Sequence, residues 1–338
     1  MNKKILVAGG AGFIGVNFIK YMLNENPDNK IINFDALTYA GNLASLASCE
    51  NNPNYEFVHG DIRNAEDVAE AIKKYNVDSI INFAAESHVD RSIDGPHVFL
   101  DTNIFGTYTL LQAARDFDIQ RYLQVSTDEV YGSLGKTGLF TESTTIKPNS
   151  PYSASKASAD HMVRAWHKTY GLNAVITRCS NNYGAYQFPE KMIPLCIYNA
   201  RNGNKIPVYG DGMQIRDWLY VYDHCTAIWE VFSRAIPGEV FNIGGNNEKT
   251  NLTLVNAILA MLGKPKSLIQ FVKDRPGHDR RYAIDSSKMK ERLGWEPSLT
   301  FEEGIEKTIR WYIDNQNWLN QVTSGDYQNY YKQMYADR

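Results

Sequence analysis

Ile5-Leu-Val-Ala-Gly-Gly-Ala-Gly-Phe-Ile-Gly15 decides the fold of this 338-residue chain. Its four leading apolar residues predict a short buried strand, and the amphipathic pattern that continues to about Leu23 predicts a helix. Between them, Gly9, Gly12 and Gly15 allow a tight turn and let the backbone approach a diphosphate, which the free N–H groups of a helix start bind well. The spacing differs from the common Gly-x-Gly-x-x-Gly, and such a motif alone also fits a plain tight turn.

A second strand is predicted over residues 30–35, and it ends in Asp35, about 20 residues beyond the last glycine. We expect Asp35 to bind the adenosine ribose hydroxyls of a dinucleotide. Ala36 and Leu37 follow it, so a 2′-phosphate would meet a carboxylate with no arginine nearby, and NAD is favoured over NADP. The alternative is that Asp35 only ends the strand and starts a turn.

Apolar strands and amphipathic helices alternate along the first half of the chain. Strands are predicted over 55–59, 79–84, 121–125 and 174–179, and helices over 65–75, 98–116 and 152–170. This alternation predicts an α/β fold of the Rossmann-like type, a doubly wound parallel sheet with helices on both faces.

Beyond residue 182 the elements shorten and aromatic residues scatter, which predicts a smaller mixed α/β substrate lobe. Candidate helices there are 190–202, 222–233, 252–262, 287–293 and 302–313, with a short strand over 240–243. We therefore divide the chain into an NAD-binding domain (1–182), a nucleotide-sugar-binding lobe (183–320, allowing for chain exchange between the lobes) and a C-terminal tail (321–338).

The candidate chemistry lies at two places in the first domain. Thr127, Asp128 and Glu129 follow a predicted strand, and ligands of open parallel sheets bind beyond the carboxyl ends of strands. A serine–proline pair opens the next helix, which places Tyr152 and Lys156 one turn apart on one face. An ammonium beside a tyrosine lowers the tyrosine pKa, so Tyr152 is a candidate base near neutral pH.

Two adjacent carboxylates suit acid–base work, because like charges held close discourage double ionisation and leave one group protonated. A regular strand would point Asp128 and Glu129 to opposite faces, so we expect the backbone to leave strand geometry at Asp128. The alternative is that the pair only caps the next turn.

Composition excludes several classes of protein. The formal net charge is -3, and no basic patch predicts nucleic-acid binding. Four cysteines without paired spacing indicate reduced thiols in a cytoplasmic protein, and no segment approaches the roughly 20 apolar residues of a membrane span. The seven histidines lack metal-ligand spacing, so we expect no metal.

Together these motifs resemble the extended short-chain dehydrogenase/reductase superfamily that acts on nucleotide sugars, over nearly the whole chain. Within that superfamily, four blocks resemble the dTDP-glucose 4,6-dehydratase family. They are Thr127-Asp-Glu129, Asp35-Ala-Leu-Thr-Tyr-Ala-Gly-Asn42, Ala84-Ala-Glu-Ser-His-Val-Asp-Arg-Ser92 and Asp274-Arg-Pro-Gly-His-Asp279.

The resemblance implies that dTDP-glucose becomes dTDP-4-keto-6-deoxy-glucose and water with a retained NAD. Tyr152 would take the proton of the 4-hydroxyl while hydride leaves C4, and Lys156 would hold the nicotinamide ribose and lower the pKa of Tyr152. Thr127 would hydrogen-bond the oxygen at C4. Glu129 would take the C5 proton, Asp128 would donate to the leaving 6-oxygen, and hydride would return to C6.

The resemblance also implies two sets of contacts. Those to the cofactor are Gly9, Gly12, Phe13, Ile14, Gly15, Asp35, Ala36, Leu37, Thr38, Asp61, Ile62, Ala84, Ala85, Ser87, Thr102, Tyr152, Lys156 and Asn182. Those to the substrate are Ser87, Thr127, Asn181, Lys191, Met192, Ile193, Pro194, Leu195, Pro207, Val208, Tyr209, Arg216, Asn251, Arg275 and His278. Arg216 and Arg275 suit clamps on a diphosphate, since guanidinium forks match phosphate oxygens, or they could be surface ion-pair residues.

Three residues depart from the family pattern: Ala36 stands where lysine is common, Ala185 where proline is usual and Tyr222 where glutamate is usual. Ala36 removes one polar contact to NAD. A homodimer is implied through helices 98–116 and 153–170, packed as a four-helix bundle. Rival functions are a nucleotide-sugar 4-epimerase, which needs no acid and base for C5 and C6, a dehydratase of another nucleotide sugar, and a non-catalytic NAD-binding regulator.

Overall fold

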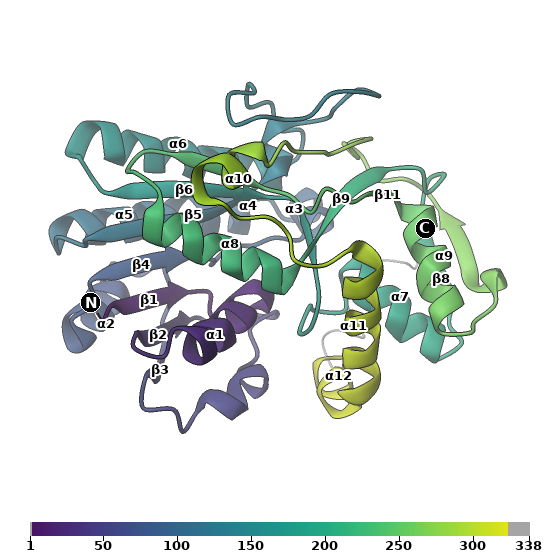
Figure 1. Ribbon diagram of the computed structural model, residues 1–338, viewed down its shortest axis with the longest axis horizontal. Helices are drawn as coiled ribbons and strands as arrows, with labels where there is room; N and C mark the ends of the chain where they lie inside the picture. Colours follow the sequence, from purple (N-terminus) through teal and green to yellow (C-terminus); the bar gives the residue numbers. More distant parts are fainter. Residues whose placement is uncertain (1, 324–338) are drawn as a thin grey trace.

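The computed structural model describes residues 2–323, and a seven-stranded parallel sheet lies at its centre (Figure 1). The strands are β1 (Lys4–Ala8), β2 (Lys30–Asp35), β3 (Tyr55–His59), β4 (Ser79–Asn82), β5 (Arg121–Thr127), β6 (Ala174–Cys179) and β10 (Val240–Ile243). Their order is β10-β6-β5-β4-β1-β2-β3, so successive strands run outward in opposite directions from the neighbours β1 and β4. The predicted doubly wound sheet is confirmed.

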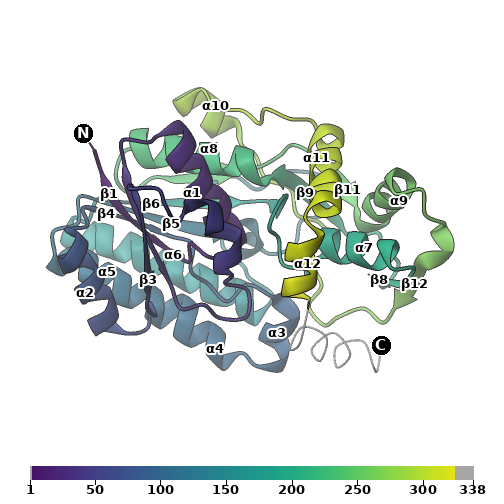
Figure 2. The same ribbon diagram turned by 90° about the horizontal axis from the view of Figure 1, so that it is seen from below.

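Helices cover both faces of this sheet, as Figure 2 shows. One face carries α1 (Phe13–Glu25), α8 (Val221–Arg234) and α10 (Ser287–Leu293), and the other carries α2 (Ala65–Tyr75), α5 (Thr107–Asp116) and α6 (Pro151–Tyr170). Side chains alternate along a strand, so Ile5 and Val7 pack into the first core while Leu6 and Ala8 pack into the second. This double burial explains the continuous apolar run of β1.

The second lobe lies beside the carboxyl ends of the strands (Figure 1). It contains the sheet β11-β9-β7, the pair β12-β8 and four helices with a core of their own. The elements are β7 (Asn181–Tyr183), α7 (Met192–Arg201), β8 (Ile206–Tyr209), β9 (Ile215–Tyr220), β11 (Glu248–Thr250), α9 (Asn251–Met261), β12 (Ile269–Val272), α11 (Phe301–Asp314) and α12 (Gln316–Val322). Between these elements the chain returns to the first domain as α8, β10 and α10, so the two lobes exchange chain.

Two predicted elements differ in detail. The strand expected over 79–84 ends at Asn82, whose side chain accepts a hydrogen bond from the backbone N–H of Ala84 and turns the chain. The helix expected over 98–116 consists of α4 (His97–Phe99), a π-helical segment (Leu100–Gly106) and α5. A short helix that was not predicted, α3 (Val89–Asp94), precedes it.

None of the helices in residues 2–323 combines the length and apolar character that crossing a bilayer requires. The four cysteines are buried and free. The same residues contain no group of three side chains suited to a metal ion. Residues 324–338 of the predicted tail lie outside the described part.

Candidate active site

A crevice opens where the strand order reverses between β1 and β4, the usual ligand position in doubly wound sheets. Its lining contains every residue of the predicted cofactor set except Leu37. Leu37 adopts a left-handed backbone (φ 50°) and donates its N–H to Asp35 Oδ1 at 2.8 Å, so it supports the site from behind. The lining also includes Ala40, Gly41, Gly60, Arg63, Phe83 and Glu86, which sequence reasoning missed.

The three glycines of the first turn meet different requirements. Gly9 has φ 77°, and a Cβ there would collide with the backbone of Ala84; one at Gly15 would collide with the Gly9 carbonyl. A Cβ at Gly12 would meet only the Gly9 carbonyl oxygen, at 3.4 Å, yet Gly12 lines both halves of the crevice. Gly12 is also the N-cap of α1, which has neither a side-chain cap nor an acidic residue in its first turn. The helix start therefore fits the diphosphate of a dinucleotide.

Asp35 closes the adenosine end of the crevice. Its oxygens accept hydrogen bonds from the backbone N–H groups of Ala11 (2.9 Å) and Leu37 (2.8 Å). Burial raises the pKa of Asp35, while these two hydrogen bonds lower it. A carboxylate fixed in this way at the end of β2 is an acceptor for ribose hydroxyls.

The acidic pair sits where β5 ends. A 3-10 helix (Asp128–Tyr131) begins directly after Thr127, whose Oγ1 accepts a hydrogen bond from the Glu129 N–H at 3.3 Å. The predicted departure from strand geometry at Asp128 is confirmed. Glu129 consequently lines both the cofactor crevice and a neighbouring pocket, while Asp128 lies behind it, 1% exposed.

The two carboxyl groups differ in their surroundings. Burial raises the pKa of Asp128 well above its ordinary value, and repulsion from Glu129 raises it further. Burial also raises the pKa of Glu129, but Arg275, Arg216 and Lys191 oppose that shift. Asp128 Oδ2 is buried and has no hydrogen-bond partner among the described residues. Asp128 therefore suits a proton donor, and Glu129 suits the partner base, because the three cationic side chains favour its charged form.

Tyr152 and Lys156 both line the cofactor crevice, one turn apart on α6. The predicted lowering of the Tyr152 pKa by Lys156 is wrong in this structure: burial raises that pKa well above its ordinary value, and Glu129 raises it further. The reason is geometric, because Lys156 Nζ donates to the Val125 carbonyl oxygen at 2.7 Å. A hydrogen bond with Thr127 lowers the pKa of Tyr152.

Asn103 connects two segments that line the cofactor crevice, the loop after β4 and helix α6. It was not predicted from the sequence. Its Nδ2 donates to Ser155 Oγ at 2.8 Å and to the Glu86 carbonyl at 2.9 Å, and its Oδ1 accepts from the Glu86 N–H at 2.9 Å. Asn103 thus ties the loop after β4 to the helix that carries Tyr152. Asn103 lies in the π-helical segment Leu100–Gly106, which carries no sequence motif from which its role could be predicted.

A second pocket adjoins the crevice through Ser87, Glu129 and Asn181. Most of the predicted substrate set lines it: Ser87, Asn181, Lys191, Met192, Leu195, Pro207, Val208, Tyr209, Arg216, Asn251, Arg275 and His278. Thr127 lies on the crevice side. Ile193 and Pro194 do not line the pocket, because the helical period of α7 turns them away from it, Ile193 into the core of the lobe. The lining residues that were not predicted are His88, Val89, Asp90, Glu190, Cys196, Trp218 and Val255.

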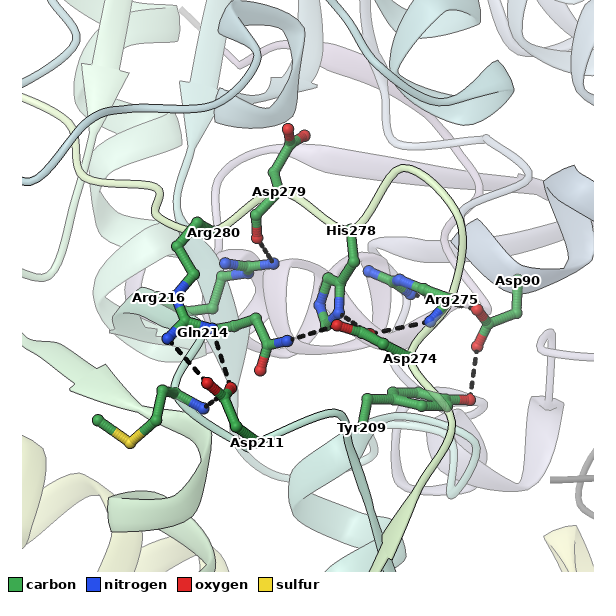
Figure 3. Close-up of polar contacts among 11 residues, drawn as sticks. Asp90, Tyr209, Asp211, Gln214, Arg216, Asp274, Arg275, His278, Asp279 and Arg280 are labelled. Atoms are coloured by element: carbon green, nitrogen blue, oxygen red, sulfur yellow. Dashed lines mark hydrogen bonds and ion pairs between the residues drawn. The ribbon is translucent and has the colours of Figure 1, made fainter.

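Basic groups converge on this pocket (Figure 3). The guanidinium of Arg216 donates to the Asp279 carbonyl at 2.9 Å and lies 4.2 Å from the ring centre of Tyr282. Arg275 pairs with Asp90, and Lys191 Nζ donates to the Ser87 carbonyl at 2.8 Å. Burial lowers the pKa of His278 to about 4. Arg216 and Arg275 both line this pocket; Arg216 is buried, whereas Arg275 is partly buried and also forms the ion pair with Asp90.

Comparison with known proteins agrees with this arrangement. The family model described as "GDP-mannose 4,6 dehydratase" matches residues 6–308. A dTDP-glucose 4,6-dehydratase of Xanthomonas campestris is 54% identical over 340 residues, covering 95% of this chain and 96% of the relative. One from Escherichia coli is 51% identical, covering 96% and 97%. This chain belongs to the dTDP-glucose 4,6-dehydratase family.

Solved structures of this family share the fold closely. The dTDP-glucose 4,6-dehydratase of Bacillus anthracis in complex with NAD has a TM-score of 0.89 at 54% identity, covering 95% of this chain and 99% of that one. The Streptomyces venezuelae enzyme, with NAD and dTDP bound, has a TM-score of 0.92 at 48% identity and covers 94% of this chain and 99% of that one. A UDP-glucose 4-epimerase of Thermotoga maritima reaches 0.86 at 29% identity, covering 94% and 100%. The fold alone therefore does not separate this family from epimerases.

The three departures from the family pattern lie away from the acidic pair. The Ala36 carbonyl contacts His59 Nε2 at 3.3 Å, the Ala185 carbonyl accepts from Asn17 Nδ2 at 3.0 Å, and Tyr222 packs edge-on against Tyr21. Only Ala36 lines the cofactor crevice.

Proposed function

We propose that this protein is an NAD-dependent dTDP-glucose 4,6-dehydratase, a hydro-lyase that converts dTDP-glucose to dTDP-4-keto-6-deoxy-glucose and water. The observation that carries the proposal is the pair Asp128–Glu129, turned out of β5 between a dinucleotide crevice and a basic pocket. NAD, when bound, supplies reversible acceptance and return of a hydride. The dehydration itself needs an acid and a base, which an epimerase does not.

Each residue of the site has a role in this proposal. Tyr152 takes the proton of the 4-hydroxyl, a role that rests on its place in the crevice beside Thr127, since burial raises its pKa. Thr127 hydrogen-bonds the same oxygen. Once C4 is a ketone the C5 proton is acidic, and Glu129, which faces three cationic side chains, accepts it. Asp128, whose raised pKa keeps its proton, donates to the departing 6-oxygen.

Binding divides between the two cavities. The crevice-lining residues around Gly12 and Asp35 hold NAD, with Lys156 at the nicotinamide ribose. The second pocket holds the nucleotide sugar, with Arg216 and Arg275 on its diphosphate. Ala36 brings no polar side chain to the crevice, so we expect NAD to be held less tightly than in relatives with lysine there.

The test is product analysis by proton NMR. The purified protein is incubated separately with dTDP-glucose, UDP-glucose and GDP-mannose. We expect a new C6 methyl doublet from dTDP-glucose alone. Conversion of UDP-glucose to its galacto isomer without a methyl signal would establish the epimerase reading instead, and a methyl from GDP-mannose alone would reassign the substrate.

We also propose a homodimer. Exposed apolar side chains gather on the surface of α4, the π-helical segment, α5 and α6: Val98, Leu100, Phe105 (61% exposed), Tyr108 and Tyr170. A four-helix bundle with a second copy would cover them. Light scattering should give twice the chain mass for the native protein and the single mass for Phe105→Asp. The buried, reduced cysteines fit a cytoplasmic enzyme.

A further inference from the structure

Asp90 is an acidic residue in the basic pocket, and no role has been given to it above. It lies on α3 of the first domain and is only 3% exposed. Tyr209 of β8 donates its hydroxyl to Asp90 Oδ2 at 3.1 Å, and Arg275 NH1 lies 3.4 Å from Asp90 Oδ1. Figure 3 shows these three side chains meeting at the pocket. Asp90 therefore joins the first domain to two separate segments of the second lobe.

Arg275 is held by one side only. Its NH1 faces Asp90, whereas its Nε is buried and has no hydrogen-bond partner among residues 2–323. A guanidinium presents its donors as a planar fork, and an unpaired N–H edge is suited to an oxyanion. The backbone around it is also anchored, because Asp274 accepts from the Arg275 N–H (2.9 Å), from Gln214 (2.9 Å) and lies 2.6 Å from His278 Nδ1.

We propose that Asp90 is a positioning residue for diphosphate recognition. It fixes the NH1 end of Arg275 and thereby directs the Nε–H of that side chain at the phosphates of the nucleotide sugar. This inference rests on the proposed function, in which Arg275 is a diphosphate clamp. It adds that the clamp is oriented across the two lobes by a carboxylate that does not itself touch the phosphates.

The direction in which diphosphate affinity changes when Asp90 is removed distinguishes a positioning role from simple charge repulsion. A carboxylate in an anion pocket repels the ligand, so its simple removal would tighten binding. Asp90 is, however, the only carboxylate in ion-pair distance of Arg275 within the described residues. Without it the long side chain loses its anchor, and its rotamer freedom has to be frozen by the ligand. We expect the loss of orientation to outweigh the loss of repulsion.

The experiment measures diphosphate affinity in the NAD-loaded enzyme. By calorimetry, Asp90→Asn should raise the Kd for dTDP about tenfold, since it removes the charge from one partner of a partly buried ion pair. KM for dTDP-glucose should rise by a similar factor while kcat changes less than twofold. Asp94→Asn, an exposed position on the same short helix, should behave as wild type. An unchanged or lowered Kd in Asp90→Asn would overturn the proposal.

A double-mutant cycle excludes a general effect on folding. Arg275→Gln should weaken dTDP binding, and adding Asp90→Asn to it should weaken binding no further, because Asp90 acts through Arg275. Additive losses would instead indicate an independent structural role and would overturn the proposal. Tyr209→Phe keeps the Asp90–Arg275 pair and should show a smaller loss of the same sign. If the wild-type enzyme binds UDP or GDP in place of dTDP, the proposed substrate is refuted. The same double-mutant cycle, measured with that nucleotide, would still test whether Asp90 positions Arg275.

Discussion

The cofactor crevice and the substrate pocket are built in different ways. The crevice is largely backbone: a glycine turn, an uncapped helix start and a carboxylate fixed by two N–H groups, all at the ends of β1 and β2. The pocket is largely side chains, brought from α3, α7, β8, β9 and the loop around Arg275, and held by ion pairs. Backbone sites tolerate little change in shape, whereas side-chain sites depend on charge and orientation. The residues proposed for catalysis lie where the two cavities meet: Glu129 lines both, and Thr127 and Tyr152 line the crevice.

The largest loss of activity is expected from a substitution at this junction. Tyr152→Phe removes the proposed base for the 4-hydroxyl, so the rate of methyl formation from dTDP-glucose should fall by about 10³-fold, within the range for a general base. NAD content should stay unchanged, because the crevice backbone is intact. Tyr222→Phe, at an exposed tyrosine of α8 that lines neither cavity, is the control. A fall below tenfold would remove Tyr152 from the base role.

A smaller loss is expected from a change at Asp128, which lies buried behind Glu129 at the junction. Asp128→Asn keeps the shape of the acid but cannot donate a carboxylic proton, so dehydration should fall by about 10²-fold. Oxidation at C4 should survive, visible as absorbance at 340 nm when enzyme and dTDP-glucose are mixed in stopped flow. Asp118→Asn, exposed in the turn before β5, is the matched control. Unchanged dehydration in Asp128→Asn would show that another group supplies the proton.

The same contrast explains what could be predicted from the sequence. Gly12, Asp35 and the Tyr152–Lys156 pair follow from local patterns, because strand ends and helical spacing place them without long-range information. The direction of the Tyr152 pKa could not be predicted, because it depends on burial and on Lys156 donating to Val125. The resemblance implied a continuous substrate-binding stretch over residues 191–195, whereas the helical period of α7 brings only one face of that stretch to the pocket. Asp90 and Asn103 have no motif and become visible only when distant segments meet.

The glycine turn offers a test confined to the crevice. Gly12→Ala adds a Cβ that the protein itself accommodates, so the melting temperature of NAD-free protein should fall only slightly, through the poorer N-cap of α1, while NAD affinity should fall about tenfold or more. Gly15→Ala should instead lower the melting temperature, because its Cβ meets the Gly9 carbonyl and Gly10. Calorimetry with NAD and thermal unfolding measure the two effects. Equal NAD affinity in Gly12→Ala and wild type would mean that no diphosphate approaches at Gly12.

The smallest effect concerns stability and the acid at the junction. The pKa of Asp128 in the folded protein lies above the ordinary value of 3.8, so folding favours its protonated form. The stability linked to this group is therefore fully present below the unfolded pKa and is lost as pH rises through the folded pKa. Asp128→Asn cannot ionise and avoids that loss. The difference in melting temperature between Asp128→Asn and wild type should therefore increase by about 2 °C, in favour of the variant, from pH 4 to pH 9. The melting temperature of Asp118→Asn should change with pH as that of wild type does. Parallel curves for Asp128→Asn and wild type would show that the folded protein accommodates the charged carboxylate without cost, and that this acid is not kept protonated by its burial.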